Sequence, residues 1–224
     1  MSKPPIWARD EPRGRGHRSA LSRAEIVRVA IEIADAEGLE AVSMRRVARE
    51  LRAGAMSLYH YFDSRDELLE LMADTVAAEM LVPDISPEWR PALEAIALHT
   101  RDMFRRHPWL LATMHEQSLV TPNLLRHIEQ TAQAVAGVDA DQELLTAIVT
   151  AVDDYTIGFT IRELGGGGRG SSERFDAPEV RYLLESGEFE LIAQFLLSGA
   201  RPPQPRFETG LAWLLDGFAA QLSS

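Results

Sequence analysis

The sequence of 224 residues contains no cysteine. Disulfide bridges, thiolate metal sites and cysteine nucleophiles are therefore excluded. No uninterrupted apolar run reaches the roughly 18 residues that a membrane-spanning helix needs, and residues 1–20 lack the apolar centre of a secretory signal. With 46% hydrophobic and 25% charged residues, the composition is that of a soluble globular protein, and we expect a cytoplasmic one with no membrane partner.

A positive net charge is also missing, because the chain carries a formal charge of −11. This total argues against a nucleic-acid partner, but the charge is unevenly distributed. Residues 1–62 hold 11 Lys and Arg against 8 Asp and Glu, a net +3, whereas residues 63–224 hold 12 against 26, a net −14. Phosphate binding depends on local charge. The segregation therefore mildly favours DNA as a partner of the N-terminal part.

Strand-like alternation and internal repeats are missing as well, so the predicted class is all-α. Capping signals predict helix starts at Ser22, Ser43, Ser64, Ser86, Thr121 and either Asp139 or Asp141. Further helices are expected from Pro178 and over residues 188–197 and 207–222. Residues 165–172 form a glycine-rich linker rather than a phosphate-binding loop, because no strand precedes them and no Gly-Lys-Ser/Thr follows.

The stretch Ser43–Phe62 has the pattern of two short helices joined by a tight turn. Its apolar residues face one way, at the spacing of a helix stripe. The opposite side carries Arg45 and Arg49 on the first helix, with Met56 and His60 on the second. Two interpretations fit the pattern alone. One is a helix-turn-helix that enters a DNA groove, and the other is an ordinary helical hairpin with a solvated outer face.

Residues 30–74, AIEIADAEGLEAVSMRRVARELRAGAMSLYHYFDSRDELLELMAD, resemble the N-terminal domain of the tetracycline-repressor (TetR) family. The LYHYF segment and the ELL helix start that follows it are the most telling part. The resemblance implies a third helix in the major groove. It also implies DNA contacts from Ser43, Arg45, Ala55, Met56, Ser57, Tyr59, His60, Tyr61 and Arg65.

These side chains suit different roles on DNA. Tyr59, Tyr61, Ser43 and Arg65 suit phosphates, which fix the register without reading sequence. Met56, Ser57 and His60 are the candidates for base edges, and Arg45 suits either role.

One position departs from the family pattern. Arg52 stands where the family usually has glycine, at the end of the second helix. In a left-handed backbone conformation an arginine costs roughly 1 kcal/mol relative to glycine. Either Gly54 makes the turn instead, or Arg52 accepts the strain and adds a positive charge.

The C-terminal part also resembles the TetR family, in FRRHPWL at 104–110 and FETGLAWLLDGF at 207–218. The resemblance implies a homodimer, formed as a four-helix bundle by residues 141–163 and 207–222 of each subunit, and a ligand pocket in each subunit. For the interface we expect Val149, Val152, Leu211, Leu215 and Phe218. For the pocket we expect His99, Met103, Trp109, Met114, Asp154 and Ile157. His99, Asp102 and His115 lack a defined ligand spacing, so no metal, cofactor or catalytic site is expected.

The predicted organisation has three parts: a flexible basic arm (1–20), a helix-turn-helix domain (21–66), and a helical ligand-binding and dimerisation domain (67–224). The arm is either a disordered tail or a segment that follows phosphates or a minor groove. We expect a dimeric, ligand-responsive transcriptional regulator, a repressor rather than an activator, that binds a palindromic DNA operator and is released by a small molecule. The alternative is a helical small-molecule-binding or catalytic protein with a structural N-terminal hairpin.

Overall fold

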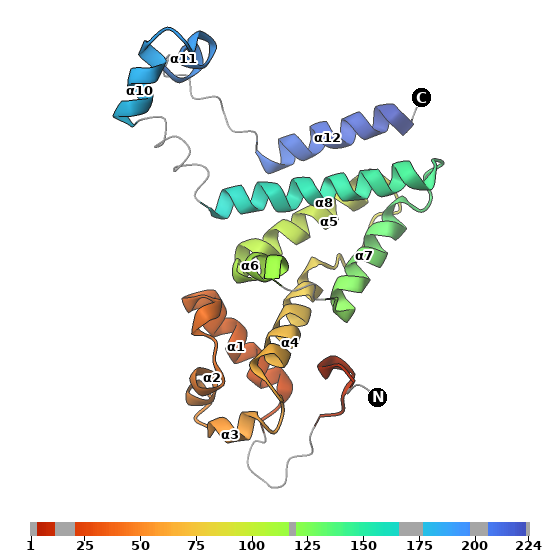
Figure 1. The fold of residues 1–224 in the computed structure, drawn as a ribbon. Coiled ribbons are helices and arrows are strands. Elements are labelled where there is room, and N and C mark those ends of the chain that lie inside the picture. The colour runs from red at the N-terminus through yellow and green to blue at the C-terminus, as the bar shows by residue number, and fades with distance from the viewer. Residues whose placement is uncertain (1–3, 12–20, 117–119, 166–176, 198–205, 223–224) are drawn as a thin grey trace. The chain divides into compact units, whose positions relative to one another are not determined.

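The computed structural model describes residues 4–11, 21–116, 120–165, 177–197 and 206–222, and every element in these ranges is helical (Figure 1). The predicted all-α class is therefore confirmed. The elements are η1 (Ile6–Ala8), α1 (Arg23–Glu37), η2 (Leu39–Ala41), α2 (Met44–Glu50), α3 (Ala55–Leu58), α4 (Arg65–Ala77), η3 (Ala78–Met80), α5 (Trp89–Arg106), α6 (Trp109–Glu116), α7 (Pro122–Val135), α8 (Gln142–Leu164), α10 (Pro178–Glu185), α11 (Glu190–Leu197) and α12 (Phe207–Leu222). They fall into two compact units, residues 1–138 and 139–224.

Side-chain caps begin most of the predicted helices. Ser22, Ser43 and Ser64 each accept a hydrogen bond from the backbone N–H three residues further on. Thr121 caps α7 in the same way, and Asp141 rather than Asp139 caps α8. These oxygens satisfy backbone donors that the first helical turn leaves without a partner.

The predicted start at Ser86 is wrong, because α5 begins at Trp89. The Ser86 hydroxyl accepts instead from the Glu88 N–H, 3.2 Å away, ahead of the helix. Pro91 explains the shift. In a helix that started at Pro87, it would lie beyond the first turn, where its missing N–H breaks a helical hydrogen bond and its ring strikes a carbonyl. A start at Trp89 places Pro91 within the first turn.

Arg52 takes the left-handed backbone at the end of α2, with φ of 53°. The Arg52 N–H bonds to the Arg49 carbonyl and the Ala53 N–H to the Ala48 carbonyl, which is the Schellman arrangement. Gly54 has φ of −76° and caps α3, so it does not make the turn. Of the two alternatives, the strained arginine is the one observed.

The first unit is built around α4. Helix α1 packs against α4, and α2 packs against α3 and α1, with Ile26, Val47, Leu58, Leu68 and Met72 among the buried side chains. Helices α5 and α7 pack against each other, and α7 also packs on α4.

Polar contacts fix α7 to the end of α4. The Asn123 backbone N–H donates to Asp74 Oδ1 over 2.8 Å, and the Gln130 amide donates to the Val82 carbonyl over 2.8 Å. The Val82 N–H in turn donates to Gln130 Oε1 over 2.9 Å.

Asp35 links α1 to the connection between α5 and α6. Its Oδ1 lies 2.8 Å from His107 Nδ1 and accepts a hydrogen bond of 2.7 Å from the Trp109 indole N–H. The other ring nitrogen of His107, Nε2, lies 3.3 Å from Glu79 Oε1. His107 and Trp109 belong to the string FRRHPWL and are both buried. This part of the string therefore bonds to the N-terminal helices.

Residues 4–11, which belong to the predicted arm, pack against the first unit's helices. Ile6 is buried and η1 packs against α4. The rest of the predicted arm, residues 12–20, lies outside the described residues.

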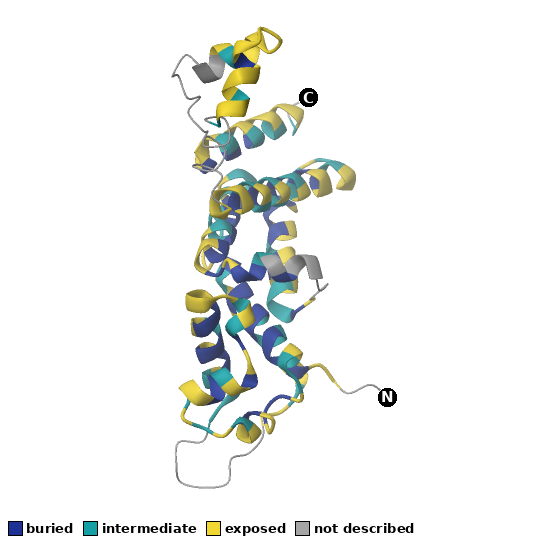
Figure 2. Cartoon of the chain, turned by 60° about the vertical axis from the view of Figure 1, so that its left-hand side comes forward, coloured by how far each residue is buried: buried dark blue, intermediate teal, exposed yellow. Residues whose placement is uncertain are grey.

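In the second unit α8 packs against α12. The Tyr155 hydroxyl donates to the Phe207 carbonyl over 2.8 Å, and the rings of Tyr155, Phe159 and Phe207 stack with centroids 5.3–5.8 Å apart. The pair α10 and α11 is largely exposed (Figure 2).

Helix α8 spans 23 residues, and its most apolar window has a mean hydropathy of 1.4. Within the chain, 28% of this window is buried. Its length and composition alone are those of a helix that could cross a membrane, and core helices of soluble proteins meet the same two criteria.

Candidate nucleic-acid interface

Helices α2 and α3 turn their apolar side chains inward and their polar side chains outward. Val47, Ala48 and Leu58 are buried, whereas Ser43 and Arg45 are exposed. This is the two-sided arrangement predicted for Ser43–Phe62. It leaves polar side chains of both helices exposed to solvent.

The outer side of α3 and its exit turn carries large exposed side chains. Met56 is 80% exposed and Tyr59 is 47% exposed. Ser57 and His60 are exposed beside them, and Ala55 is half-buried. Contact with water is unfavourable for an apolar side chain, so a partner surface that buries exposed Met56 would be stabilising.

Two residues of the predicted DNA set are tied into the protein. Tyr61 is only 8% exposed, and its ring meets that of His60 edge to face. Arg65 donates from Nε to the Val42 carbonyl over 2.7 Å and from Nη2 to the Leu39 carbonyl over 3.0 Å. These contacts fasten α4 to the segment before α2. The predicted phosphate contacts of Tyr61 and Arg65 stay predictions.

The arginines of α2 divide into paired and free side chains. Arg46 bonds to Glu37 and Glu50, each over 2.6 Å. The Glu50 and then the Glu37 hydrogen bonds raise the pKa of Arg46, and the same Arg46 contact lowers the pKa of Glu50. Arg45, Arg49 and Arg52 are exposed, with no ion pair to any carboxylate of the described ranges.

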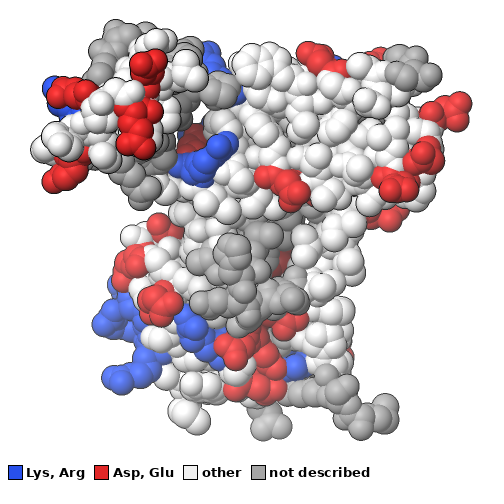
Figure 3. Space-filling model, turned by 45° about the horizontal axis from the view of Figure 1, so that its top comes forward, with Lys and Arg blue, Asp and Glu red and all other residues white. Residues whose placement is uncertain are grey.

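Helix α2 packs against α3, and a group of basic side chains is visible over the N-terminal helices (Figure 3). Arg49 and Arg52 were not among the predicted site residues. Their signal was available in the sequence, since both fall on the arginine side of the first helix.

The residues predicted to line a ligand pocket come from both units. In the first, Met103 and Trp109 are buried and His99 is half-buried. In the second, Ile157 is half-buried, and exposed Asp154 lines an open depression of about 750 Å³ on α8 with Thr146 and Thr150. The side chain of Met114 lies outside the described residues. The pocket stays a prediction.

Among the described residues of the first unit, three buried polar atoms lack a hydrogen-bond partner: Glu79 Oε2, His127 Nδ1 on α7 and Thr100 Oγ1 on α5. Glu79 Oε2 forms an ion pair with Arg106. Burial lowers the pKa of His127, which favours its neutral form. On α8, burial and then the neighbouring Asp154 raise the pKa of Asp153 to about 6. Sequence reasoning missed His127 and Thr100, because nothing in the local pattern distinguishes them from satisfied core residues.

Three of the five predicted interface residues are covered within the single chain. Val152, Leu211 and Leu215 are buried, whereas Val149 and Phe218 are half-buried. A side chain that is already covered adds almost no new apolar burial on association. The interface set stays a prediction. The large apolar side chains left exposed on α8 and α12 are Ile161, Leu164 and Trp213.

Within the described ranges, no group of three or more His, Asp or Glu side chains is placed to hold a metal ion.

Comparison with known proteins gives matches along most of the chain. Residues 26–72 match the sequence family "Bacterial regulatory proteins, tetR family". Residues 82–222 match "Tetracyclin repressor-like, C-terminal domain". The HTH-type transcriptional repressor DrrR1 of Streptomyces coeruleorubidus is 35% identical over 223 residues, which cover 95% of this chain and 82% of DrrR1.

Two solved structures illustrate the shared fold. ActR of Streptomyces coelicolor in complex with actinorhodin is 29% identical, with a TM-score of 0.71 over 91% of this chain and 99% of ActR. BioQ of Mycobacterium smegmatis, solved with its double-stranded DNA operator, is 22% identical, with a TM-score of 0.58 over 89% of this chain and 99% of BioQ. The second likeness shows the fold alone.

Proposed function

The chain is a member of the TetR family of bacterial regulatory proteins, and we propose that it is a ligand-responsive repressor that binds a palindromic operator as a homodimer. The observation that carries the proposal is the outer surface of α2 and α3. There, Met56, Tyr59 and His60 are exposed on α3 and its exit turn. On α2 and its C-terminal turn, Arg45, Arg49 and Arg52 are exposed and form no ion pair with a carboxylate of the described ranges.

The roles on DNA follow from the chemistry of these groups. Arg45, Arg49 and Arg52 supply charge for phosphates, and Ser43 and Tyr59 supply hydroxyl groups that fix the register. Met56, Ser57 and His60 face the base edges, where an apolar side chain contacts a thymine methyl group and a polar one contacts donors and acceptors.

The dimer follows from family membership and from the apolar surface of the second unit. Only 28% of the most apolar window of α8 is buried within the chain, and Trp213 on α12 is 64% exposed. A second copy of the chain that covers α8 and α12 removes this surface from water. Two DNA-binding heads then fit successive major grooves when they lie roughly 34–36 Å apart.

A small molecule releases the operator if it binds better to a dimer whose heads do not match that spacing. DNA and ligand then weaken each other by the same coupling free energy. Because ActR was solved in complex with actinorhodin, actinorhodin is the first compound to screen. The readout is thermal unfolding, because a bound ligand stabilises the native state. We place the protein in the cytoplasm and assign it no catalytic activity.

DNA binding is tested by fluorescence anisotropy with DNA fragments from upstream of the protein's own gene. We expect Tyr59→Ala and Arg45→Ala to weaken binding by roughly 10-fold or more, and Arg45→Ala also to reduce the salt slope by about 1. Arg126→Ala is the control, because Arg126 is an exposed arginine on α7. Wild-type protein that binds none of the fragments at low salt would favour the alternative, a helical small-molecule-binding or catalytic protein.

A further inference from the structure

An N-terminal segment, Pro4–Glu11, lies against the DNA-binding helices, and we refer to it as the N-terminal strap. Ile6 anchors it, because its side chain is buried where η1 packs against α4. At the other end of the strap, Glu11 Oε1 accepts a hydrogen bond of 2.6 Å from the Arg23 N–H at the start of α1. The strap is thus fixed to two helices of the first unit.

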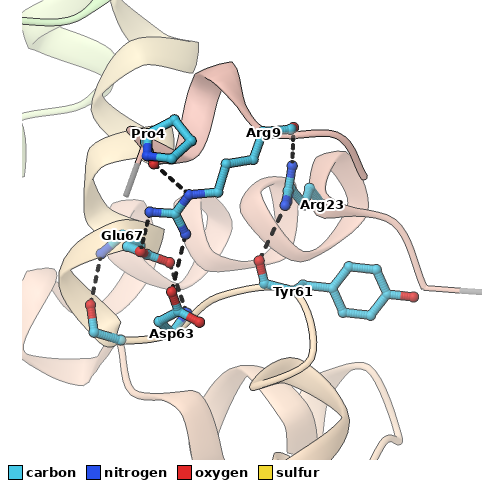
Figure 4. A network of polar contacts seen from close by, with 7 residues as sticks. Pro4, Arg9, Arg23, Tyr61, Asp63 and Glu67 are labelled. Atoms are coloured by element: carbon cyan, nitrogen blue, oxygen red, sulfur yellow. Dashed lines mark hydrogen bonds and ion pairs between the residues drawn. The ribbon is translucent and has the colours of Figure 1, made fainter. Parts of the chain in front are cut away.

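Arg9 makes the central contacts of the strap (Figure 4). Its Nε donates to the Pro4 carbonyl over 2.6 Å, Nη1 lies 3.1 Å from Asp63 Oδ2, and Nη2 lies 2.8 Å from Glu67 Oε1. The hydrogen bond with Glu67 raises the pKa of Arg9. All three guanidinium nitrogens are engaged within the protein, and the side chain is only 16% exposed. This geometry leaves Arg9 poorly placed to bind a phosphate directly.

Of the carboxylates that Arg9 contacts, Asp63 lies in the turn between α3 and α4, and Glu67 lies in the first turn of α4. The second oxygen of Glu67, Oε2, accepts the Asp63 N–H over 2.7 Å, while the Ser64 hydroxyl caps α4. Arg23 adds a parallel connection. It donates from Nε to the Tyr61 carbonyl over 3.3 Å and from Nη1 to the Arg9 carbonyl over 2.6 Å (Figure 4).

The position of α3 depends on such contacts, because α3 comprises only Ala55–Leu58. A helix of one turn is not stable by itself, so its direction is set by packing and by the turns at its ends. Leu58 and Phe62 hold the inner side through burial. The Arg9 and Arg23 contacts hold the exit turn that carries Tyr59 and Tyr61. A recognition surface must be held to within about 0.5 Å to act.

We propose that Arg9 is a positioning residue for DNA binding, which holds the exit of α3 through Glu67 and Asp63 without contacting DNA. This inference rests on the proposed function.

The test compares Arg9→Ala with wild-type protein on the same upstream DNA fragment, at a temperature where both are folded by circular dichroism. We expect roughly 10-fold weaker binding, the loss typical of one charged hydrogen bond, with the salt slope unchanged because no phosphate contact is removed. Arg126→Ala changes the charge equally and should leave the affinity unchanged.

A double-mutant cycle with Glu67→Gln identifies the route of the effect. If Arg9 acts through Glu67, Arg9→Ala costs about 3-fold or less in the Glu67→Gln background. An equal cost in both backgrounds, together with a salt slope reduced by about 1, would make Arg9 a phosphate contact and overturn the proposal. Wild-type affinity of Arg9→Ala would overturn it as well.

If Arg9→Ala fails to fold, Arg9→Lys replaces it. Lysine keeps the charge but lacks the planar fork that reaches two carboxylates and a carbonyl. We then expect roughly 3-fold weaker binding, and full wild-type affinity would contradict the positioning role. Wild-type protein that binds no DNA fragment refutes the proposed function itself, which is a different outcome.

Discussion

Replacing Asp35 by alanine removes a carboxylate that joins three helices of the first unit. Asp35 Oδ1 serves two buried donors, the Trp109 indole N–H at 2.7 Å and His107 Nδ1 at 2.8 Å. Because a carboxylate only accepts hydrogen bonds, His107 Nδ1 is the donor in this contact. Alanine therefore leaves two buried donors without their acceptor.

The magnitude follows from what each donor loses. A hydrogen bond to a charged group contributes about 1.5–3 kcal/mol, and an unsatisfied buried donor costs a similar amount. The Asp35 side chain is about a third exposed, which weakens its contacts through solvent screening. We therefore expect a total of about 2–3 kcal/mol for Asp35→Ala. In a chain of this length, that corresponds to a fall in the unfolding midpoint of about 5–10 °C.

The assay is thermal unfolding followed by circular dichroism at one fixed protein concentration, because dimerisation makes the midpoint depend on concentration. Asp102→Ala is the matched control, since Asp102 is an exposed carboxylate on α5 and should change stability by less than about 0.5 kcal/mol. A midpoint for Asp35→Ala within about 2 °C of wild type would refute the reasoning. It would show that water or Glu79 replaces the lost acceptor.

Four further predictions follow from single sites. Arg52→Gly should raise the free energy of unfolding by about 1 kcal/mol, measured by urea denaturation, by relieving the left-handed backbone, while it weakens DNA binding in the anisotropy assay. Gly210→Ala should lower the free energy of unfolding by about 1–3 kcal/mol, because the added Cβ would overlap the Tyr155 hydroxyl on α8. The pKa of Asp153 is raised to about 6, so its carboxyl does not oppose folding below the ordinary value of 3.8, opposes it increasingly between pH 3.8 and about 6, and opposes it by a constant amount at higher pH. Asp153→Asn should therefore raise the unfolding midpoint at about pH 7.5 and leave it unchanged near pH 3, and an equal rise at both would contradict this origin. Trp213→Glu should yield monomers in light scattering, because it places a charge in the proposed interface, and an unchanged dimer would place that interface elsewhere.

Local signals in the sequence were sufficient for most of the fold. Caps such as Ser43 and Ser64 act on N–H groups three residues away, so the sequence alone contains both partners of each contact. The start of α5 was misplaced because two prolines compete for the first turn. Considering Pro91 as well as Pro87 would have corrected the prediction. When the helix starts at Trp89, Pro91 lies in the first turn, where no helical hydrogen bond requires its missing N–H.

Long-range pairs are the part of the structure that the sequence did not predict. Asp35 and Trp109 are 74 positions apart, and Arg9 and Asp63 are 54 positions apart. No sequence periodicity relates such distant residues. Each of them, considered alone, could equally be a solvent-exposed residue of its own helix or loop. The predicted interface residues illustrate a related point. The stripe of α12 that contains Leu211 and Leu215 is buried within the single chain, and hydrophobic periodicity does not tell which apolar side faces the chain's own core.

The arginines show where local pattern and structure must be combined. Arg45 and Arg46 are consecutive, and both contribute equally to the positive net charge of the N-terminal part. Arg46 has Glu50 four positions on, which the sequence displays as an i,i+4 pair, and the fold adds Glu37 from the end of α1. Arg9 is likewise neutralised, by carboxylates that only the fold brings near. The charge available for phosphates in the described part of the DNA-binding domain is therefore smaller than its composition indicates. It lies mainly on Arg45, Arg49 and Arg52, so these three should determine most of the salt dependence contributed by α2 and its C-terminal turn.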